Sequence, residues 1–430
     1  MRTGCTGEFI RQLPDRMAAS SRLYVKLRRY RGTRREVVDQ TKLPSPYFIT
    51  PPAILAALLL LSSLSAGRKA EQSTSSIPEP EQTDLFIGGE GGYHTYRIPA
   101  LLATPKGTLL AIVEGRKDSV EDHGHIELLM RRSWDGGRTW SPVQLVKKDG
   151  TNALNNPTVV VDRDTGTIWL VFIWTSTQKY KNNGDVAKAQ GRVSDVWVMH
   201  SNDEGATWEG PVNITRSVNR RGWNRILPGP GVGIQLHSGR LVIPCNHEIG
   251  PVATDHIIYS DDHGKTWRLG GSTEAKTDES QVVELADGSL MLNIRNYQER
   301  GHRAISISKD AGLTWSKVTT DPTLIEPQCE ASFIRYTLSP PFARNRLLFS
   351  NPASNDRVNM TVRLSYDEGK TWPVAKLLNR GGSGYSCLTV LPDMQIGCLY
   401  ERGVHHSIEK VTFARFSVEW LTDGADSVTR

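Results

Sequence analysis

One eight-residue pattern, S-x-D-x-G-x-T-W, constrains the fold of this chain more than any other feature. Its Ser, Asp, Gly, Thr and Trp recur in five copies, at 133–140, 201–208, 260–267, 308–315 and 365–372. The Asp carboxylate can accept backbone N–H bonds in a tight turn, and the Gly can adopt a positive φ that a side chain would penalise. Thr and Trp favour the returning strand. Each copy therefore predicts a β-hairpin turn rather than a reactive site.

The spacing of the copies predicts a closed all-β fold. Copies begin 48 to 68 residues apart, short strand-like runs flank them, and helical periodicity is scarce. Repeats of this length built from short strands are typical of β-propeller blades, whereas the repeats of a β-helix are much shorter. We therefore predict an all-β, six-bladed β-propeller over residues 85–421. Its first and last strands are expected to share one blade and close the ring.

The positive charge of the chain is concentrated near its N-terminus. Residues 1–70 hold 13 Lys and Arg against 4 Asp and Glu, whereas the remaining 360 residues hold 39 against 42. The predicted propeller therefore gives no compositional reason to expect nucleic-acid binding.

An apolar segment, AILAALLLLSSLSAG at 53–67, follows the basic residues. A short apolar run between basic and small residues is typical of a secretory signal, and this run is short for a membrane span. The alternative is an uncleaved anchor that tethers the protein to a membrane. We predict a leader, signal or anchor and disordered linker over 1–84, and a C-terminal tail at 422–430. The protein is expected to be secreted or exported, periplasmic or extracellular.

Four of the five cysteines lie in the predicted propeller: Cys245, Cys329, Cys387 and Cys398. They allow about three pairings, and the sequence does not choose among them. The sequence contains no CxxC pair and no HExxH motif, so it predicts neither a metal site nor a cofactor.

The stretch YRIP at 96–99, followed by the five turns, resembles the sialidase (exo-α-neuraminidase) family over about residues 85–420. The resemblance implies a six-bladed propeller and a substrate, sialic acid, with a carboxylate on its anomeric carbon. Guanidinium groups match carboxylates in a bidentate geometry, and the family uses three of them. The resemblance assigns this role to Arg97, to Arg295 in LNIRNY and to Arg357 in SNPASNDRVNMTVRLS, where Arg363 is the alternative.

The resemblance also implies a tyrosine nucleophile, Tyr385 in GGSGYSCL. A carboxylate nucleophile would be repelled by the substrate carboxylate, whereas a neutral phenol would not, and sialidases are an exception among glycosidases in using tyrosine. A phenol with a pKa of about 10 needs an adjacent base. Glu279 in TDESQVVELADGSL, 16 residues before Arg295, matches the family glutamate, and Glu284 in the same stretch is the alternative.

A general acid is required to protonate the departing glycosidic oxygen. The family aspartate lies in a loop before the strand that enters the first turn, and Asp122 fits this position best. The other acidic residues of the same stretch are Asp118, Glu121 and Glu127. An exposed Asp has a pKa of about 4, so substrate binding would have to raise that pKa for Asp122 to act as an acid.

Two further residues complete the site that the resemblance implies. Glu401 in CLYERG matches a glutamate that pairs with Arg97, and Arg116 in VEGRKD resembles a residue that contacts the sugar ring, or else is a surface arginine. The predicted function is metal-independent hydrolysis, with retention, of terminal α-linked sialic acids on glycoproteins, glycolipids and oligosaccharides. Two alternatives stay open: a non-catalytic sialoglycan-binding propeller, and a trans-sialidase that uses the same residues.

Overall fold

The computed structural model describes residues 77–178 and 194–429, which belong to one compact unit, Ser73–Arg430. The basic leader, the apolar segment 53–67 and the start of the predicted linker lie outside the described residues. Among the described residues, no helix is long and apolar enough to cross a membrane. The secretory signal and the membrane anchor therefore stay predictions from the sequence.

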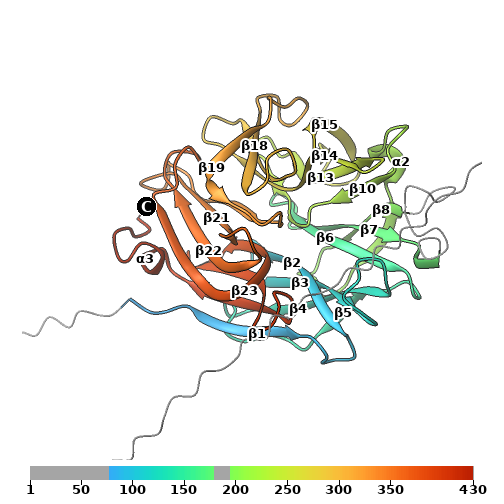
Figure 1. Cartoon of the computed structure of the whole chain (residues 1–430), viewed down its shortest axis with the longest axis horizontal. Helices are drawn as coiled ribbons and strands as arrows, with labels where there is room; N and C mark the ends of the chain where they lie inside the picture. The colour runs from blue at the N-terminus through green and yellow to red at the C-terminus, as the bar shows by residue number, and fades with distance from the viewer. Residues whose placement is uncertain (1–76, 179–193, 430) are drawn as a thin grey trace, which may run out of the picture. The chain divides into compact units, whose positions relative to one another are not determined.

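The described strands form six antiparallel blades of four strands each, arranged around a common centre (Figure 1). The first blade contains β2 (Thr95–Ala103), β3 (Leu109–Arg116), β4 (Ile126–Ser133) and β5 (Gln144–Lys147). The second contains β6 (Ala153–Val161), β7 (Ile168–Thr175), β8 (Ser194–Ser201) and β9 (Glu209–Asn213), with the short β11 (Gly231–Val232) paired to β6. In the third, β10 (Arg225–Pro228) and β12 (Ile234–Gln235) share the inner position beside β13 (Leu241–Ile249), β14 (Val252–Ser260) and β15 (Arg268–Ala275).

The remaining blades complete the ring. The fourth contains β16 (Thr277–Glu284), β17 (Leu290–Asn296), β18 (His302–Ser308) and β19 (Thr319–Ile325). The fifth contains β20 (Ser332–Thr337), β21 (Arg346–Pro352), β22 (Val358–Ser365) and the first half of β23 (Val374–Val390). The second half of β23 begins the sixth blade, followed by β24 (Ile396–Gly403) and β25 (Lys410–Phe416). Two single-turn helices, α2 (Thr215–Val218) and α3 (Val418–Leu421), lie outside the blades.

Strands from both ends of the propeller close the ring. β1 (Glu81–Ile87) pairs with β25 in antiparallel register, from Glu81 opposite Arg415 to Ile87 opposite Lys410. Figure 1 shows β1 beside the C-terminal strands. The predicted six-bladed β-propeller with a shared closing blade is confirmed. The sixth blade also has no S-x-D-x-G-x-T-W turn, because its fourth strand comes from the N-terminal side of the chain.

One predicted boundary is wrong, and the predicted C-terminal tail has contacts with the propeller. β1 begins at Glu81, so residues 81–84 belong to the closing blade and not to a disordered linker. At the other end, Asp426 is 7% exposed, and its carboxylate accepts two hydrogen bonds of 2.7 Å from the guanidinium of Arg346. The predicted tail that follows α3 is therefore packed on the propeller through Asp426.

The S-x-D-x-G-x-T-W turns join the third strand of a blade to the fourth. In the third blade, the Asp262 carboxylate accepts hydrogen bonds from the Thr266 N–H at 2.8 Å and from its hydroxyl at 2.6 Å. Gly264 has a φ of 85°, and a Cβ there would collide with Trp169 of the second blade. Trp267 is 2% exposed and packs edge-on against Trp169, with ring centroids 6.3 Å apart. The pattern therefore builds a hairpin and joins neighbouring blades.

The turns and the predicted site residues lie at opposite ends of the strands. In the first blade, Arg97 is opposite Glu114 near one end of the β2–β3 ladder. At the other end of β3, Leu109 is opposite Ser133, the first residue of the turn. The propeller thus has a turn face and, across the blades, a face that carries the candidate site.

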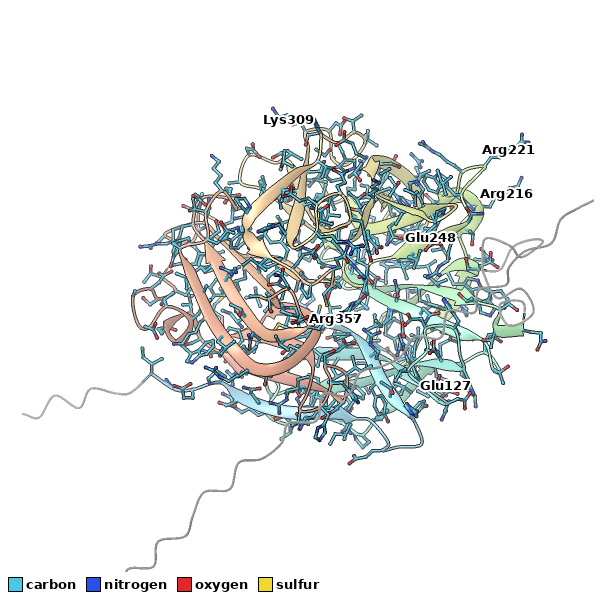
Figure 2. All side chains as sticks on the ribbon, in the orientation of Figure 1. Glu127, Arg216, Arg221, Glu248, Lys309 and Arg357 are labelled. Atoms are coloured by element: carbon cyan, nitrogen blue, oxygen red, sulfur yellow. The ribbon has the colours of Figure 1, made fainter. Side chains whose placement is uncertain are left out.

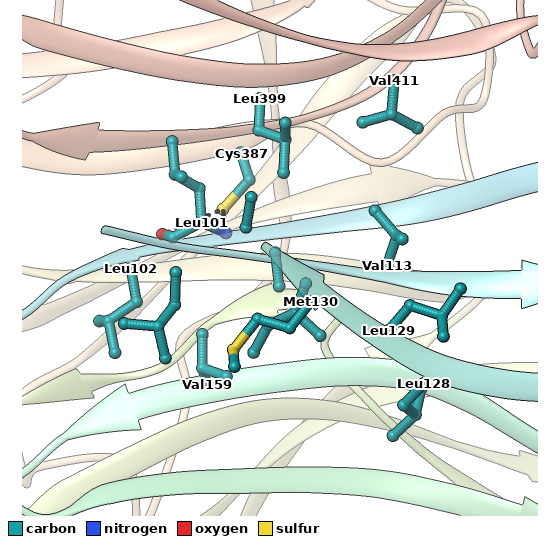
Figure 3. Packing of buried hydrophobic residues seen from close by; sticks show 14 of the residues in the cluster. Leu101, Leu102, Val113, Leu128, Leu129, Met130, Val159, Cys387, Leu399 and Val411 are labelled. Carbon is teal, nitrogen blue, oxygen red and sulfur yellow. Dashed lines mark hydrogen bonds between the residues drawn. The ribbon is translucent and has the colours of Figure 1, made fainter. Parts of the chain in front are cut away.

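Buried apolar side chains join the first, second and last blades into one core (Figure 3). The Leu101 N–H on β2 donates a hydrogen bond of 3.2 Å to Sγ of Cys387 on β23, so the inner strands of the first and sixth blades are in direct contact. The four described cysteines are buried free thiols, and burial raises the pKa of Cys329 to about 12.

Asp262→Ala should lower the free energy of unfolding by about 1–3 kcal/mol, because it removes several hydrogen bonds that hold the turn before Trp267. Urea unfolding measures the change. Lys265→Ala, an exposed position in the same turn, is the matched control. Equal midpoints for the two variants would contradict the role of the Asp in the turn.

Candidate active site

The eight residues that the sequence analysis selected come from the same face of the propeller. They lie on or next to the strands of the first, fourth, fifth and sixth blades: Arg97 on β2, Arg116 at the end of β3, Asp122 in the β3–β4 loop, Glu279 on β16, Arg295 on β17, Arg357 directly before β22, Tyr385 on β23 and Glu401 on β24. In Figure 2, Arg357 lies near the middle of the view, whereas Lys309, in a turn, lies at its edge.

Tyr385 is at the centre of this group and is 5% exposed. Its hydroxyl donates to Glu279, with oxygen–oxygen distances of 2.6 Å to Oε1 and 2.8 Å to Oε2. Nη1 of Arg295 donates to the same hydroxyl at 3.2 Å and to Oε2 of Glu279 at 2.7 Å. Burial raises the pKa of Tyr385 well above its usual value, Glu279 adds to the rise, and nearby arginines lower it. The site thus holds a neutral phenol against a carboxylate that can accept its proton.

Three arginines surround Tyr385. Cζ of Arg97 lies 5.1 Å from the centroid of the tyrosine ring, Cζ of Arg357 lies 5.4 Å from it, and Arg295 contacts the hydroxyl. The alternative, Arg363, lies within β22 between β21 and β23, where burial lowers its pKa and Asp321 raises it. Of the two candidates in that stretch, Arg357 is the one that the fold brings to Tyr385.

Glu401 is fully buried and holds both the first arginine and the tyrosine strand. Its Oε1 accepts hydrogen bonds from Nε of Arg97 and from the Ile98 N–H, both at 3.0 Å. Its Oε2 accepts from Nη2 of Arg97 at 3.3 Å and from the Tyr385 N–H at 3.1 Å. Burial alone would lower the pKa of Arg97, but Glu401 and, less strongly, Tyr385 and Asp122 raise it overall. The geometry contains the predicted Arg97–Glu401 pair and extends it to the tyrosine.

The β-ladders are interrupted where they carry these residues. The register shifts between Arg97 and Ala100 on β2, and Ile98 has a φ of 58°. A second shift lies between Ser383 and Ser386 on β23, where the Tyr385 N–H bonds to the side chain of Glu401 on the neighbouring β24. A β-bulge of this kind re-aims a side chain. These irregularities turn the Arg97 and Tyr385 side chains toward one centre.

Arg116 and Asp122 form a pair in the first blade. Arg116 is 1% exposed, and its Nη2 lies 2.7 Å from Oδ1 of Asp122 and 2.7 Å from Oε2 of Glu114. Nη1 of Arg97 lies 3.6 Å from the same Asp122 oxygen, and the Asp122 side chain is 63% exposed. Burial would raise the pKa of Asp122, but Arg116 and Arg97 lower it overall. Arg116 is therefore a buried partner of Asp122 and not a surface arginine.

Two rival acidic residues have other partners. Glu284 accepts a hydrogen bond of 2.9 Å from the His237 N–H and lies 2.7 Å from that ring, at the turn end of β16. Glu127 accepts a hydrogen bond from the Tyr93 hydroxyl and pairs with His125 at 3.2 Å. The other two, Asp118 and Glu121, share the β3–β4 loop with Asp122.

Three carboxyl groups that the sequence analysis missed support the site. Glu114, fully buried, binds Arg116, and its position two residues before Arg116 on a strand was a signal available in VEGR. Glu330 accepts a hydrogen bond of 3.1 Å from the Ser386 N–H, and burial raises its pKa well above the usual value. Asp278 precedes Glu279 directly. Neither Glu330 nor Asp278 had a recognisable sequence signal.

One group of metal-ligating type occurs among the described residues. Atoms of Asp162, Asp164 and His263 lie within 4.8 Å of one another on the turn face. Nε2 of Gln235 already donates to Asp162 at 2.8 Å and to Asp164 at 3.0 Å, and Nδ1 of His263 lies 2.8 Å from Asp162. These bonds account for the cluster, and it is not part of the candidate site.

The fold and the site define a β-propeller protein with a cluster of three arginines around a tyrosine–glutamate pair. A family model described as a BNR repeat-like domain matches residues 107–398. The sialidase of Micromonospora viridifaciens is 36% identical over 87% of this chain and 59% of its own length. The sialidase of Bacteroides fragilis is 35% identical over 74% of this chain and 62% of its own length, and the exo-α-sialidase of Aspergillus fumigatus is 31% identical over 86% and 98%.

Solved structures agree with these relatives. The Hadza microbial sialidase Hz136 is 34% identical, with a TM-score of 0.73 over 79% of this chain and 69% of that chain. A leech intramolecular trans-sialidase shares the fold, with a TM-score of 0.69 and 20% identity over 80% of this chain and 71% of that chain. The chain belongs to the sialidase family. It spans about 60% of the length of the Micromonospora and Bacteroides relatives.

Glu401→Gln should lower the free energy of unfolding by about 3–5 kcal/mol, because it leaves the buried Arg97 cation without its counter-charge. The amide NH2 of the substituted side chain would also point at N–H donors that now donate to a carboxylate oxygen of Glu401, so those hydrogen bonds would be lost. Chemical denaturation measures the loss, and Glu90→Gln, at an exposed carboxylate, is the control. A Glu401→Gln stability equal to that of the control would show that Glu401 does not hold these strands together.

Proposed function

We propose that the protein is an exo-sialidase that hydrolyses terminal α-linked sialic acids of glycoproteins, glycolipids and oligosaccharides, with retention and with Tyr385 as the nucleophile. The observation that carries the proposal is the hydrogen bond of 2.6 Å between the Tyr385 hydroxyl and Glu279. Three arginines, Arg97, Arg295 and Arg357, surround this tyrosine. Membership of the sialidase family supports it.

The arginines suit the anionic part of such a substrate. A carboxylate on the anomeric carbon needs donors that approach from several directions, and guanidinium groups provide them as fixed, permanently charged forks. Arg97 and Arg295 are already oriented, by Glu401 and Glu279 respectively. Binding the carboxylate between them places the anomeric carbon close to the tyrosine hydroxyl.

In the proposed first step, the Tyr385 oxygen bonds to the anomeric carbon while the glycosidic bond breaks. The phenolic proton passes to Glu279, which already accepts a hydrogen bond from it. Because the pKa of Tyr385 is raised in the substrate-free protein, the phenol needs this base to become a nucleophile. The neighbouring arginines lower that pKa and so stabilise the developing phenolate.

Asp122 is the proposed acid, and it supplies the proton that the departing glycosidic oxygen takes up. In the free protein, Arg116 and Arg97 hold the pKa of Asp122 below its usual value. A bound substrate carboxylate would neutralise part of the Arg97 charge and cover the exposed Asp122 side chain. Both changes favour the protonated form of Asp122.

In the second step, water attacks the anomeric carbon of the tyrosyl intermediate and gives up a proton to Asp122. The bond to Tyr385 breaks, and Glu279 returns the proton to the phenolic oxygen. Two inversions give net retention. A trans-sialidase would follow the same first step and pass the sugar to another hydroxyl, so analysis of the products separates hydrolysis from transfer.

Export of the protein is a further part of the proposal. It is supported by the sequence alone, through the apolar segment 53–67 and the basic residues that precede it.

Tyr385→Phe should lower turnover of a fluorogenic sialoside by several orders of magnitude, because only the attacking oxygen is removed. Calorimetric binding of a sialic acid analogue should weaken far less, since the arginines are unchanged. Tyr336→Phe removes a buried phenolic oxygen that bonds to the Met394 carbonyl and is the matched control. Near-normal turnover by Tyr385→Phe would refute the nucleophile. Binding by the wild-type protein without turnover would instead identify a sialoglycan-binding propeller.

Asp122→Asn should lower turnover of a natural sialoside by about 10²–10⁴, the usual effect of losing a general acid. The loss should be much smaller for a nitrophenyl sialoside, whose leaving oxygen needs little protonation. Steady-state kinetics on both substrates measures the difference. An equal loss on both substrates would exclude Asp122 as the general acid. It would not contradict the proposal that the wild-type protein is a sialidase.

A further inference from the structure

Asp278 is a second carboxyl group beside the base Glu279, and the mechanism proposed above does not use it. It lies directly before Glu279 on β16, and its side chain is 19% exposed. Its Oδ1 accepts a hydrogen bond of 2.6 Å from Nδ2 of Asn246, on β13 of the third blade. Its Oδ2 lies 3.8 Å from Nε of Arg295. The carboxyl group of Asp278 is thus held by a side chain of the third blade and directed at an arginine of its own, fourth blade.

A bulge explains how two consecutive acidic residues reach one guanidinium. Successive side chains of a regular strand point to opposite faces, so Asp278 and Glu279 would normally diverge. The β16–β17 register shifts between Thr277 and Ser280, opposite Arg295. Oε2 of Glu279 lies 2.7 Å from Nη1 of Arg295, and Asp278 lies near Nε. Among the described residues, that Nε has no hydrogen-bond partner.

The charges around Asp278 oppose its ionisation. Burial raises the pKa of Asp278 to about 6, the neighbouring Glu279 adds to the rise, and Arg295 partly offsets it. Glu248 on β13 raises that pKa more weakly. The ionisable groups facing Asp278 from the strands around it are Glu248 on β13, Asp255 on β14, Glu279 on β16, Arg295 on β17 and Tyr297 directly after β17.

We propose that Asp278 controls the affinity of the site for the substrate carboxylate: its ionised form competes for Arg295 and repels the substrate, and its protonated form releases the guanidinium. This inference rests on the proposed sialidase function and adds a specificity-determining residue to it. Protonated Asp278 therefore favours binding of an anionic sugar, and this form prevails in mildly acidic surroundings.

The sign of the pH effect follows from the raised pKa. Below about pH 6 Asp278 is neutral, and Arg295 keeps its full attraction for the substrate anion. Above that pH Asp278 carries a negative charge close to Arg295 and to the substrate anion that Arg295 would bind. The KM should therefore increase as the pH rises through this window. The kcat depends on Tyr385, Glu279 and Asp122, so it should not change with the ionisation of Asp278.

The test is the KM of Asp278→Asn and of wild type, measured on a nitrophenyl sialoside between about pH 5 and pH 8. Asn keeps an oxygen that can accept the Asn246 hydrogen bond but never carries a charge. At about pH 5 the two proteins should have similar KM values. At about pH 7.5 the variant should have a KM about fivefold to tenfold lower, the effect of one charge a few ångströms away in a solvated site.

Glu248→Gln is the matched control, because it removes the same charge on the neighbouring strand. It should leave most of the pH dependence of KM in place. A KM for Asp278→Asn that rises with pH as in wild type would overturn the proposal, and so would a higher KM at every pH in a protein with wild-type thermal unfolding.

A binding measurement separates this inference from the proposed function. Calorimetry with free sialic acid should show an affinity that falls above about pH 6 in wild type but not in Asp278→Asn. A wild-type protein that releases no sugar yet shows this difference would refute the hydrolase and leave the role of Asp278 standing. An affinity with the same pH dependence in both proteins would overturn that role.

Discussion

The buried carboxylate of Glu401 connects the two halves of the site. It accepts hydrogen bonds from Arg97 and from the Ile98 and Tyr385 N–H groups, so one charge holds both the Arg97 side chain and the strand that carries Tyr385. Arg97 belongs to the first blade, and Tyr385 to the sixth. These blades come from opposite ends of the propeller sequence and are in direct contact where the Leu101 N–H on β2 donates to Cys387 on β23. Assembly of the site is therefore coupled to closure of the propeller.

The regular part of the fold and the irregular part have separate tasks. On the turn face, the Asp of each S-x-D-x-G-x-T-W hairpin accepts a hydrogen bond of 2.6 Å from the Thr hydroxyl. The Trp of a hairpin can also pack on the next blade, as Trp267 does against Trp169. On the site face, the β2, β16 and β23 ladders all shift register where they carry residues of the candidate site. The shifts let neighbouring residues approach one centre, which straight strands would not allow.

The sequence predicted the features that depend on short-range patterns. The turns are local, their number indicates the blades, and the resemblance selects Arg97, Arg295, Arg357 and Tyr385. The start of β1 was missed because a short polar strand has little signal of its own, and its partner β25 lies at the other end of the chain. Asp278 was missed because the alternation of a regular strand directs it away from Glu279. Only the tertiary register shows that both face Arg295.

The charge balance of the site explains why an anionic sugar would fit it. Arg97 is paired with Glu401, Arg295 with Glu279, and Arg116 with Glu114 and Asp122. Among the described residues Arg357 has no such ion pair, and its Nη2 donates to the Gln328 carbonyl at 3.3 Å. Burial and Arg97 lower the pKa of Arg357, but Cys329 and Tyr385 raise it overall. Arg357 is therefore the one of these four arginines that has no carboxylate partner among the described residues. A substrate carboxylate next to Tyr385 would give it such a partner, whereas an ionised Asp278 competes with the substrate for Arg295.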